Sequence, residues 1–225
     1  MGYVRDVFRQ RHMSALSGKY GIGHVRYPTA GGAGKEFAQP MYVNTPYGIS
    51  LAHNGNLTNS TNLASELFHA EKRHINTNSD SEVLLNIFAL ELSKQDAVYP
   101  QAKDFFAAVQ KTHMRINGAY AVITVIAGHG LLAFRDPLGI RPLIIGERQG
   151  KQRKEYVIAS ENALFTSLGF KTVRNVLPGE AIFIDNDGNL HSQQCFDKVQ
   201  NSPCIFEYVY PVSYTHLTLP TTPYV

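Results

Sequence analysis

The chain has little of several features that would assign it to a specialised class of protein. Its 225 residues include two cysteines and no tryptophan, and charged residues amount to only 17%. Cys195 and Cys204 have eight residues between them, a spacing typical of neither a disulfide framework nor a zinc site. We therefore expect reduced thiols in a cytoplasmic protein, and no metal or other cofactor held by this chain.

Neither the charge nor the hydrophobic runs indicate a nucleic-acid or membrane partner. The net charge is +3, which is too small to attract a polyanion strongly. The longest apolar run, residues 119–127, is interrupted by Thr124 and has the length of a strand. A membrane-spanning helix needs about 20 apolar residues. We expect a globular protein that binds neither nucleic acid nor a membrane.

The hydrophobic periodicity predicts helices grouped apart from many strands. Three strands are expected first, at 20–27, 41–44 and 49–52, and then three helices that include 63–68, 83–92 and 105–109. Further strands are expected at 119–127, 131–134, 143–146, 156–159, 181–184 and 190–195, with a short helix over 161–168. This grouping is typical of an α+β or layered-sheet architecture.

An Asn-Gly pair directly follows the strand predicted at 49–52. Asn54 and Gly55 both tolerate positive φ, so the pair is typical of a hairpin turn. The same pair can form an oxyanion hole, because the Asn54 carboxamide and the Gly55 N–H can both donate to one developing negative charge. The dipeptide alone favours the turn, and both alternatives stay open at this point.

Two charged residues each have a structural and a functional interpretation. Arg26 lies at the end of the strand predicted at 20–27, where it can bind a carboxylate or form a structural ion pair. Asp80 lies between Ser79 and Glu82, a pattern that predicts a capping box at the start of a helix. Its functional interpretation is a carboxylate that receives a substrate ammonium. Spacing alone favours the structural interpretation for both.

Other conspicuous residues are interpreted as structural. Residues 134–143 join two strands through a Pro-x-Gly turn with flanking charges, which we interpret as a braced turn without a catalytic role. His53 adjoins the Asn-Gly pair and is expected to be a packed strand residue and not a base. The Gly-rich residues 31–34 depart from the phosphate-loop pattern and are interpreted as a loop.

In their order along the chain, five segments resemble the glutaminase domain of the amidophosphoribosyltransferases, a family of class II glutamine amidotransferases. These segments are 21–31, 52–59, 78–82, 134–143 and 204–210. The resemblance implies the four-layer αββα fold of the N-terminal-nucleophile hydrolases, incomplete at the N-terminus, over residues 1–207. Residues 208–225 are expected to begin an interdomain connection and to continue into a non-native tail.

The resemblance also implies roles for five residues. Arg26 and Thr29 would hold the α-carboxylate of the substrate glutamine, and Asp80 would hold its α-ammonium. Asn54 and Gly55 would form the oxyanion hole for the side-chain amide. In the family, an N-terminal cysteine attacks this amide, its own α-amine serves as the base, and ammonia is released.

We expect the nucleophile to be missing from this chain, which would then be an inactive fragment. No cysteine precedes Cys195, and a thiol in mid-chain lacks a free α-amine. By resemblance, a phosphoribosyltransferase domain with Mg²⁺ would follow downstream and use the ammonia to convert phosphoribosyl pyrophosphate to 5-phosphoribosylamine. This is the first step of purine biosynthesis, in a parent protein expected to be a homo-oligomer. Whether Cys204 binds an iron–sulfur cluster stays open.

Two other functions remain open. One is another class II amidotransferase, similar to glucosamine-6-phosphate synthase, although that relative would be expected to have Trp where Tyr27 stands. The other is a non-catalytic module that retains the glutamine pocket without the nucleophile.

Overall fold

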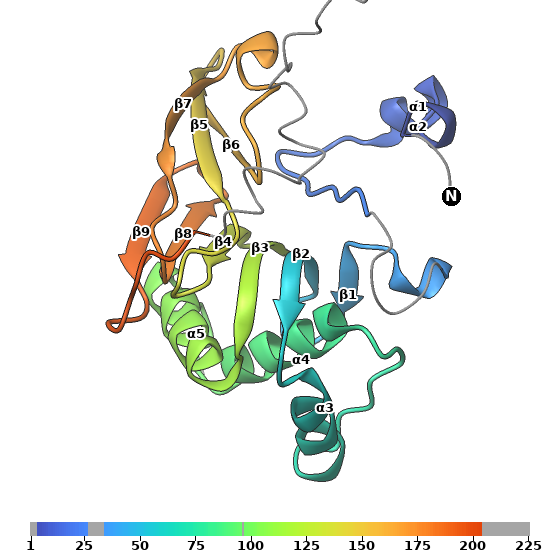
Figure 1. Cartoon of the computed structure of the whole chain (residues 1–225). Helices are drawn as coiled ribbons and strands as arrows, with labels where there is room; N and C mark the ends of the chain where they lie inside the picture. Colours follow the sequence, from blue (N-terminus) through green and yellow to red (C-terminus); the bar gives the residue numbers. More distant parts are fainter. Residues whose placement is uncertain (1–3, 27–33, 96, 204–225) are drawn as a thin grey trace, which may run out of the picture.

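The computed structural model describes residues 4–26, 34–95 and 97–203, so that Thr29 and Cys204 lie outside the described part. Its body consists of two antiparallel sheets and a group of helices (Figure 1). The larger sheet has the order β1-β2-β3-β4-β8-β9: β1 (Met41–Val43), β2 (Ile49–Leu57), β3 (Gly118–Ile126), β4 (Gly130–Arg135), β8 (Glu180–Asp185) and β9 (Leu190–Gln194). The smaller sheet has the order β6-β5-β7: β5 (Ile144–Gln149), β6 (Lys154–Ala159) and β7 (Lys171–Asn175).

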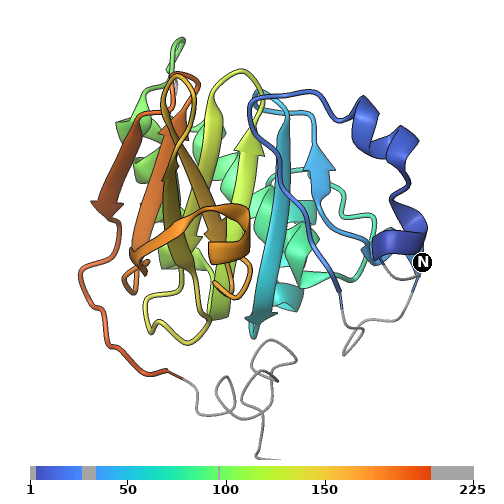
Figure 2. The ribbon, with the colours of Figure 1, turned by 90° about the horizontal axis from the view of Figure 1, so that it is seen from above.

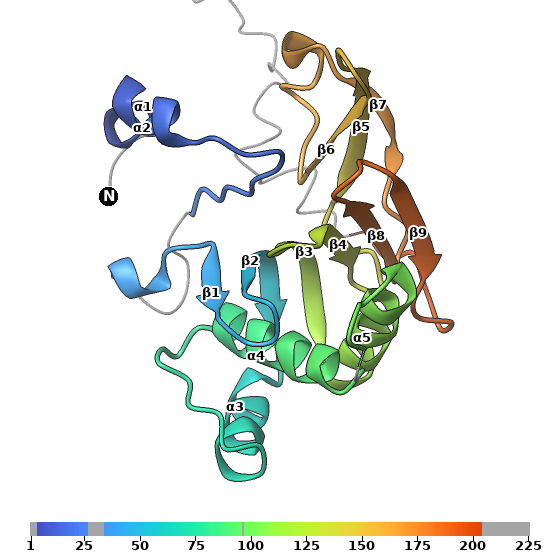
Figure 3. The ribbon, with the colours of Figure 1, turned by 180° about the vertical axis from the view of Figure 1, so that it is seen from behind.

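The larger sheet is the middle layer, with helices on one face and the smaller sheet on the other (Figure 1, Figure 3). The covering helices are α3 (Ser60–His69), α4 (Asp80–Ser93) and α5 (Ala102–Arg115). Alternate residues of β3 enter two different hydrophobic cores. Tyr120 and Val122 pack with the helices, whereas Ala121 and Ile123 pack with residues of β5 such as Ile145. Within the described residues the layers are therefore α, β and β.

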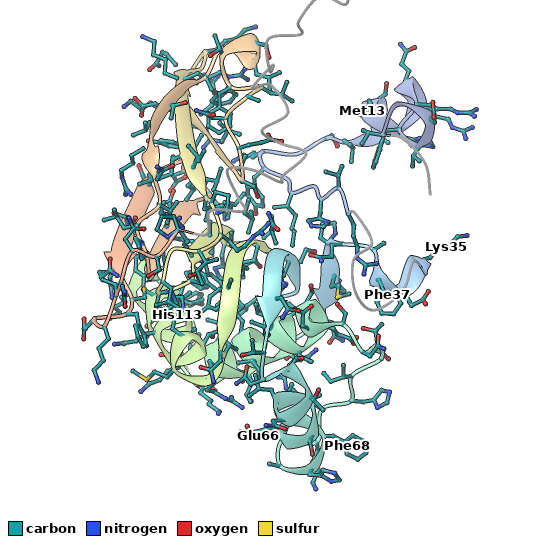
Figure 4. The ribbon with its side chains drawn as sticks, viewed as in Figure 1. Met13, Lys35, Phe37, Glu66, Phe68 and His113 are labelled. Atoms are coloured by element: carbon teal, nitrogen blue, oxygen red, sulfur yellow. The ribbon has the colours of Figure 1, made fainter. Side chains whose placement is uncertain are left out.

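Two short helices lie to one side of this body. Helices α1 (Val4–Val7) and α2 (Gln10–Ala15) lie beyond the β1 edge of the larger sheet (Figure 2). Met13 of α2 is exposed and lies well away from α3 to α5 (Figure 4). The 3₁₀ turn η1 (Lys35–Phe37) precedes β1. No helix in the described residues is long and apolar enough to cross a membrane.

The predicted α+β class is confirmed, and most predicted elements are present with altered ends. The strand predicted at 20–27 is wrong for residues 20–26, which form no strand. A run of β-prone residues becomes a strand only where another strand pairs with it. The helix predicted over 161–168 is reduced to the 3₁₀ turn η2 (Thr166–Leu168). Strand β7 was not predicted, because its mostly exposed, polar sequence lacks an alternating pattern. The predicted boundary at residue 207 lies outside the described residues.

Candidate functional site

Asn54 and Gly55 lie within β2 and not at a turn between two strands. Asn54 is paired with Ala121 and Gly55 with Tyr120 on the neighbouring strand β3. The hairpin alternative is therefore wrong. Gly55 has a φ of 151°, and a Cβ atom at this position would lie 2.0 Å from the backbone oxygen of Ala119. Only glycine fits here, because the backbone of β3 occupies the space that a side chain would need.

Two residues from distant segments bind the carboxamide of Asn54. The guanidinium of Arg141 donates a hydrogen bond to Asn54 Oδ1. Asn54 Nδ2 donates to the hydroxyl oxygen of Ser160, at 3.2 Å, and Ser160 directly follows β6. No role was predicted for either partner, because they are 87 and 106 residues away from Asn54.

The segment that carries Arg141 is held in place by a buried carboxylate. Asp136 is fully buried and accepts hydrogen bonds from four backbone N–H groups, those of Tyr120, Leu138, Ile140 and Arg141, at 3.0–3.3 Å. The guanidinium of Arg135 donates to three carbonyl oxygens, those of Gly139, Arg141 and Val176. These bonds confirm the braced turn, and they fix the backbone from which Arg141 reaches Asn54.

Asp80 is the first residue of α4, and its carboxylate binds the backbone of β2. Asp80 Oδ2 accepts a hydrogen bond of 2.9 Å from the Leu57 N–H, and the side chain remains 23% exposed. Leu57 is three residues beyond Asn54, which corresponds to about 10 Å along a strand. A glutamine molecule with a hydrogen bond at each end spans a similar length. The substrate-binding roles of Asp80 and Asn54 stay predictions.

The predicted capping box at the start of α4 is only half correct. Ser79 is the N-cap, and its hydroxyl accepts from the Ser81 N–H. The carboxylate of Glu82, however, accepts four hydrogen bonds from the N–H and side-chain groups of Asn76 and Thr77. Burial alone would raise the pKa of Glu82, but these bonds outweigh it and lower the pKa. Glu82 thus fixes the loop that leads into Asp80.

His53 belongs to β2, and its side chain is buried and neutral and faces α4. Its Nδ1 shares a hydrogen bond of 3.1 Å with the Ser81 hydroxyl and lies 4.0 Å from Asp80 Oδ2. Burial lowers the pKa of His53 to about 4, although the Asp80 carboxylate acts in the opposite direction. The expectation of a packed strand residue is confirmed. Because His53 is uncharged at neutral pH, it leaves the negative charge of Asp80 available for a cation.

Arg26 contacts Phe37, the last residue of η1. Its guanidinium carbon is 5.3 Å from the ring centroid of Phe37, which is within the range of a cation–π interaction. Burial and the charge of Arg26 both lower the pKa of His24, and His24 in turn lowers that of His53. The segment before residue 27 therefore lies near β2. The carboxylate-binding role of Arg26 stays a prediction, and that of Thr29 falls outside the described residues.

Cys195 is not suited to nucleophilic chemistry. It directly follows β9 and is 1% exposed. Burial raises the pKa of its thiol to about 12, so that the reactive thiolate is scarce at neutral pH. Among residues 4–26, 34–95 and 97–203, no group of three His, Cys, Asp or Glu residues is arranged to hold a metal ion.

Comparison with known proteins first defines the class. A solved structure described as the allosteric regulatory enzyme of purine biosynthesis superposes with a TM-score of 0.77 at 33% identity, over 95% of this chain and 42% of that one. The layered α+β architecture is thus that of the N-terminal-nucleophile hydrolases.

The family follows from the sequence. A model of the glutamine amidotransferase domain matches residues 32–167, more than half of the chain, and the chain belongs to this family. The amidophosphoribosyltransferase of Escherichia coli is 55% identical over 210 residues, and that of Pseudomonas aeruginosa is 54% identical over 209. Each alignment covers 93% of this chain but 42% of the relative. The chain therefore spans about two fifths of the length of these curated relatives.

Proposed function

We propose that the chain is the glutamine-hydrolysing part of an amidophosphoribosyltransferase. The ammonia released from the glutamine side chain would displace pyrophosphate from phosphoribosyl pyrophosphate and give 5-phosphoribosylamine, the first step of de novo purine biosynthesis. The support for this choice of enzyme is the name that the relatives carry and their identity of up to 55% with this chain.

The observation that carries the proposal is that Asn54 and Gly55 lie in β2 and that Asp80, the first residue of α4, binds the end of the same strand. Asp80 is anchored to the N–H of Leu57, at one end of β2, and the Asn-Gly pair lies three and two residues before it. A zwitterionic amino acid needs an anion for its ammonium, and its side-chain amide needs N–H donors where negative charge develops. Asp80 would meet the first requirement, and Asn54 and Gly55 would meet the second.

The chemistry of this arrangement is electrostatic stabilisation of a tetrahedral intermediate. When a nucleophile adds to the glutamine amide carbon, the carbonyl oxygen becomes an oxyanion. The carboxamide of Asn54 and the N–H of Gly55 would donate to that oxygen, and removing one such donor typically lowers the rate by a factor of about 10²–10³. The Asp80 carboxylate would hold the ammonium, and Arg26 and Thr29 the α-carboxylate.

We assign the nucleophile, its base and the phosphoribosyl transfer to groups outside the described residues. We propose a cysteine nucleophile whose α-amine is the base, supplied from outside this sequence, because Cys195 is unreactive. The second half-reaction belongs to a phosphoribosyltransferase domain that uses Mg²⁺. We further propose that the parent enzyme is a cytoplasmic homo-oligomer, which light scattering of the intact protein would test.

Calorimetry of the 225-residue chain with L-glutamine tests the substrate site without requiring turnover. We expect saturable binding of L-glutamine and none of D-glutamine. Asp80→Asn retains an oxygen for the Leu57 N–H but loses the charge, and should weaken binding at least tenfold. The matched variant Asp187→Asn, at an exposed position, should bind as the original chain does. Failure of L-glutamine to bind, or undiminished binding by Asp80→Asn, would contradict the proposal.

Sequencing of the locus tests the parent enzyme separately. We expect an in-frame phosphoribosyltransferase domain downstream and a Cys-Gly start upstream. A sugar isomerase domain in the downstream position would instead assign the chain to a hexosamine-forming amidotransferase.

A further inference from the structure

We propose that Arg141 and Ser160 are positioning residues that fix the orientation of the Asn54 carboxamide, so that its nitrogen and not its oxygen is presented to the substrate. This inference rests on the proposed function, because it concerns the same oxyanion hole. It assigns a task to two residues that lie 87 and 106 positions away from Asn54 in the sequence.

The orientation of this carboxamide decides whether the site attracts or repels an oxyanion. An asparagine side chain presents two N–H donors on one side and an acceptor oxygen on the other. Rotation by 180° about the last side-chain bond exchanges them, and the torsion itself has only a broad, nearly two-fold preference. An unrestrained Asn54 would thus present its oxygen for part of the time, and the partial negative charge of that oxygen would oppose the reaction.

Arg141 selects one of the two orientations. A guanidinium has five donors and no acceptor, so its partner on Asn54 is Oδ1. The opposite orientation would bring the amide N–H₂ against a cation and leave a part-buried donor without its acceptor. Asp136 accepts from the backbone N–H of Arg141 and Arg135 donates to its carbonyl oxygen, so the backbone that carries the guanidinium is held in place. The contact also places a permanent positive charge beside the proposed oxyanion hole.

Ser160 completes the restraint from the smaller sheet. Its hydroxyl oxygen accepts from Asn54 Nδ2 at 3.2 Å. This bond uses one of the two amide hydrogens, and the second remains to donate to a ligand. Asn54 belongs to the larger sheet, whereas Ser160 directly follows β6 of the smaller one. The amide is therefore held between the two sheets, and its direction depends on their packing.

The side-chain amide signals of Asn54 in the ligand-free 225-residue chain provide a direct test. With ¹⁵N-labelled asparagine, and with Asn54 assigned from its loss in Asn54→Ser, the two amide protons should exchange slowly with water. Arg141→Met retains most of the aliphatic stem and removes the donors, so we expect at least tenfold faster exchange and a shift toward free asparagine values. Ser160→Ala should shift mainly one of the two protons. Arg141→Lys retains a cationic donor and should restore part of the protection.

A matched variant separates this effect from general loosening of the fold. Arg148→Met also removes a guanidinium with two partners, Glu155 and the carbonyl of Leu168, but in the smaller sheet away from Asn54. It should leave the Asn54 signals unchanged. Unchanged Asn54 signals in Arg141→Met, with the chain folded, would overturn the proposal. If Arg141→Met does not fold, Ser160→Ala provides the same test, because it deletes a single oxygen atom and is expected to fold. Unchanged Asn54 signals in Ser160→Ala would then overturn the proposal.

Ligand binding then connects the orientation to the substrate. L-Norvaline has the ammonium and carboxylate of glutamine but lacks the side-chain amide. Arg141→Met and Ser160→Ala should lower the affinity for L-glutamine roughly tenfold, as expected for one lost hydrogen bond, and leave that for L-norvaline unchanged. An equal loss for both ligands would contradict the inference. If the original chain binds neither ligand, the proposed function fails, while the amide signals still decide the orientation.

Discussion

Acidification should destabilise this chain through His113, a histidine buried between α5 and the larger sheet (Figure 4). His113 is 4% exposed, and its Nδ1 shares a hydrogen bond of 2.8 Å with the hydroxyl of Tyr120. Its ring lies among the rings of Tyr120, Phe134 and Phe196. Within the described residues, Nε2 has no hydrogen-bond partner. A proton added to the ring would therefore create a charge that no described residue balances.

The magnitude follows from the difference in pKa between the two states of the chain. Burial lowers the pKa of His113 to about 3 in the folded chain, against an ordinary value of about 6.5 in the unfolded one. Below pH 6.5 His113 binds a proton in the unfolded state but remains neutral in the folded state. The free energy of unfolding therefore falls as the pH falls. Between pH 7.5 and 5 this single group should reduce it by about 2 kcal/mol, at about 1.4 kcal/mol per pH unit. His53, with a pKa of about 4, should add a similar loss.

Urea unfolding at pH 7.5 and at pH 5, followed by circular dichroism, measures this loss. His113→Gln can still bond to the Tyr120 hydroxyl but does not titrate, so its loss of stability between the two pH values should be about 2 kcal/mol smaller than that of the original chain. His74→Gln, at an exposed position, should retain the full loss. An identical loss in His113→Gln and in the original chain would refute the reasoning, even if the variant is less stable at both pH values.

Three substitutions test the structural basis of the site. Gly55→Ala should destabilise the chain by about 3 kcal/mol or more in urea unfolding, whereas Gly128→Ala, also at positive φ but in open space, should cost only about 1 kcal/mol; equal losses would refute the proposed clash with β3. Asp136→Asn places an NH₂ group against two of four N–H donors and should cost about 3 kcal/mol, which a loss below 1 kcal/mol would contradict. Glu82→Gln should accelerate hydrogen exchange in residues 76–79 at least tenfold, and unchanged protection there would show that other contacts hold this loop.

The sequence predicted the helices and most strands because their hydrophobic periodicity reports directly on burial. Residues of α4 are buried on nearly every side, and those of β3 alternate between two cores. The predictions failed where strand pairing, and not burial, determines whether a segment is a strand. Residues 20–26 have the composition of a strand but pair with no strand in the described part of the chain, and β7 pairs with β5 although most of its side chains are exposed.

The N-cap at Ser79 was predictable because its partner, the Ser81 N–H, is two residues away. The partners of Glu82 were not, although they are also local, because the capping-box pattern directs the same carboxylate to a different N–H group. Glutamate can accept from any donor within reach, and the loop of Asn76 and Thr77 offers four. A local pattern thus predicts that a polar side chain forms hydrogen bonds, but the donors that the neighbouring loop presents determine which bonds it forms.

The Asn-Gly pair shows why its function could not follow from the dipeptide. What excludes a turn at Gly55 is the backbone of Ala119, which stands 2.0 Å from the place of a Cβ atom and holds the pair inside a sheet. What directs the amide of Asn54 is a guanidinium on a segment whose shape depends on a third residue, Asp136. The contacts of Gly55 with Ala119 and of Asn54 with Arg141 each join residues more than 60 positions apart, so no short window of the sequence contains them. The role of the pair in an oxyanion hole is what the family resemblance predicts. The contacts of Arg141 and Ser160 with the Asn54 amide add a physical requirement to that prediction, because an asparagine can donate to an oxyanion only while its own oxygen is directed elsewhere.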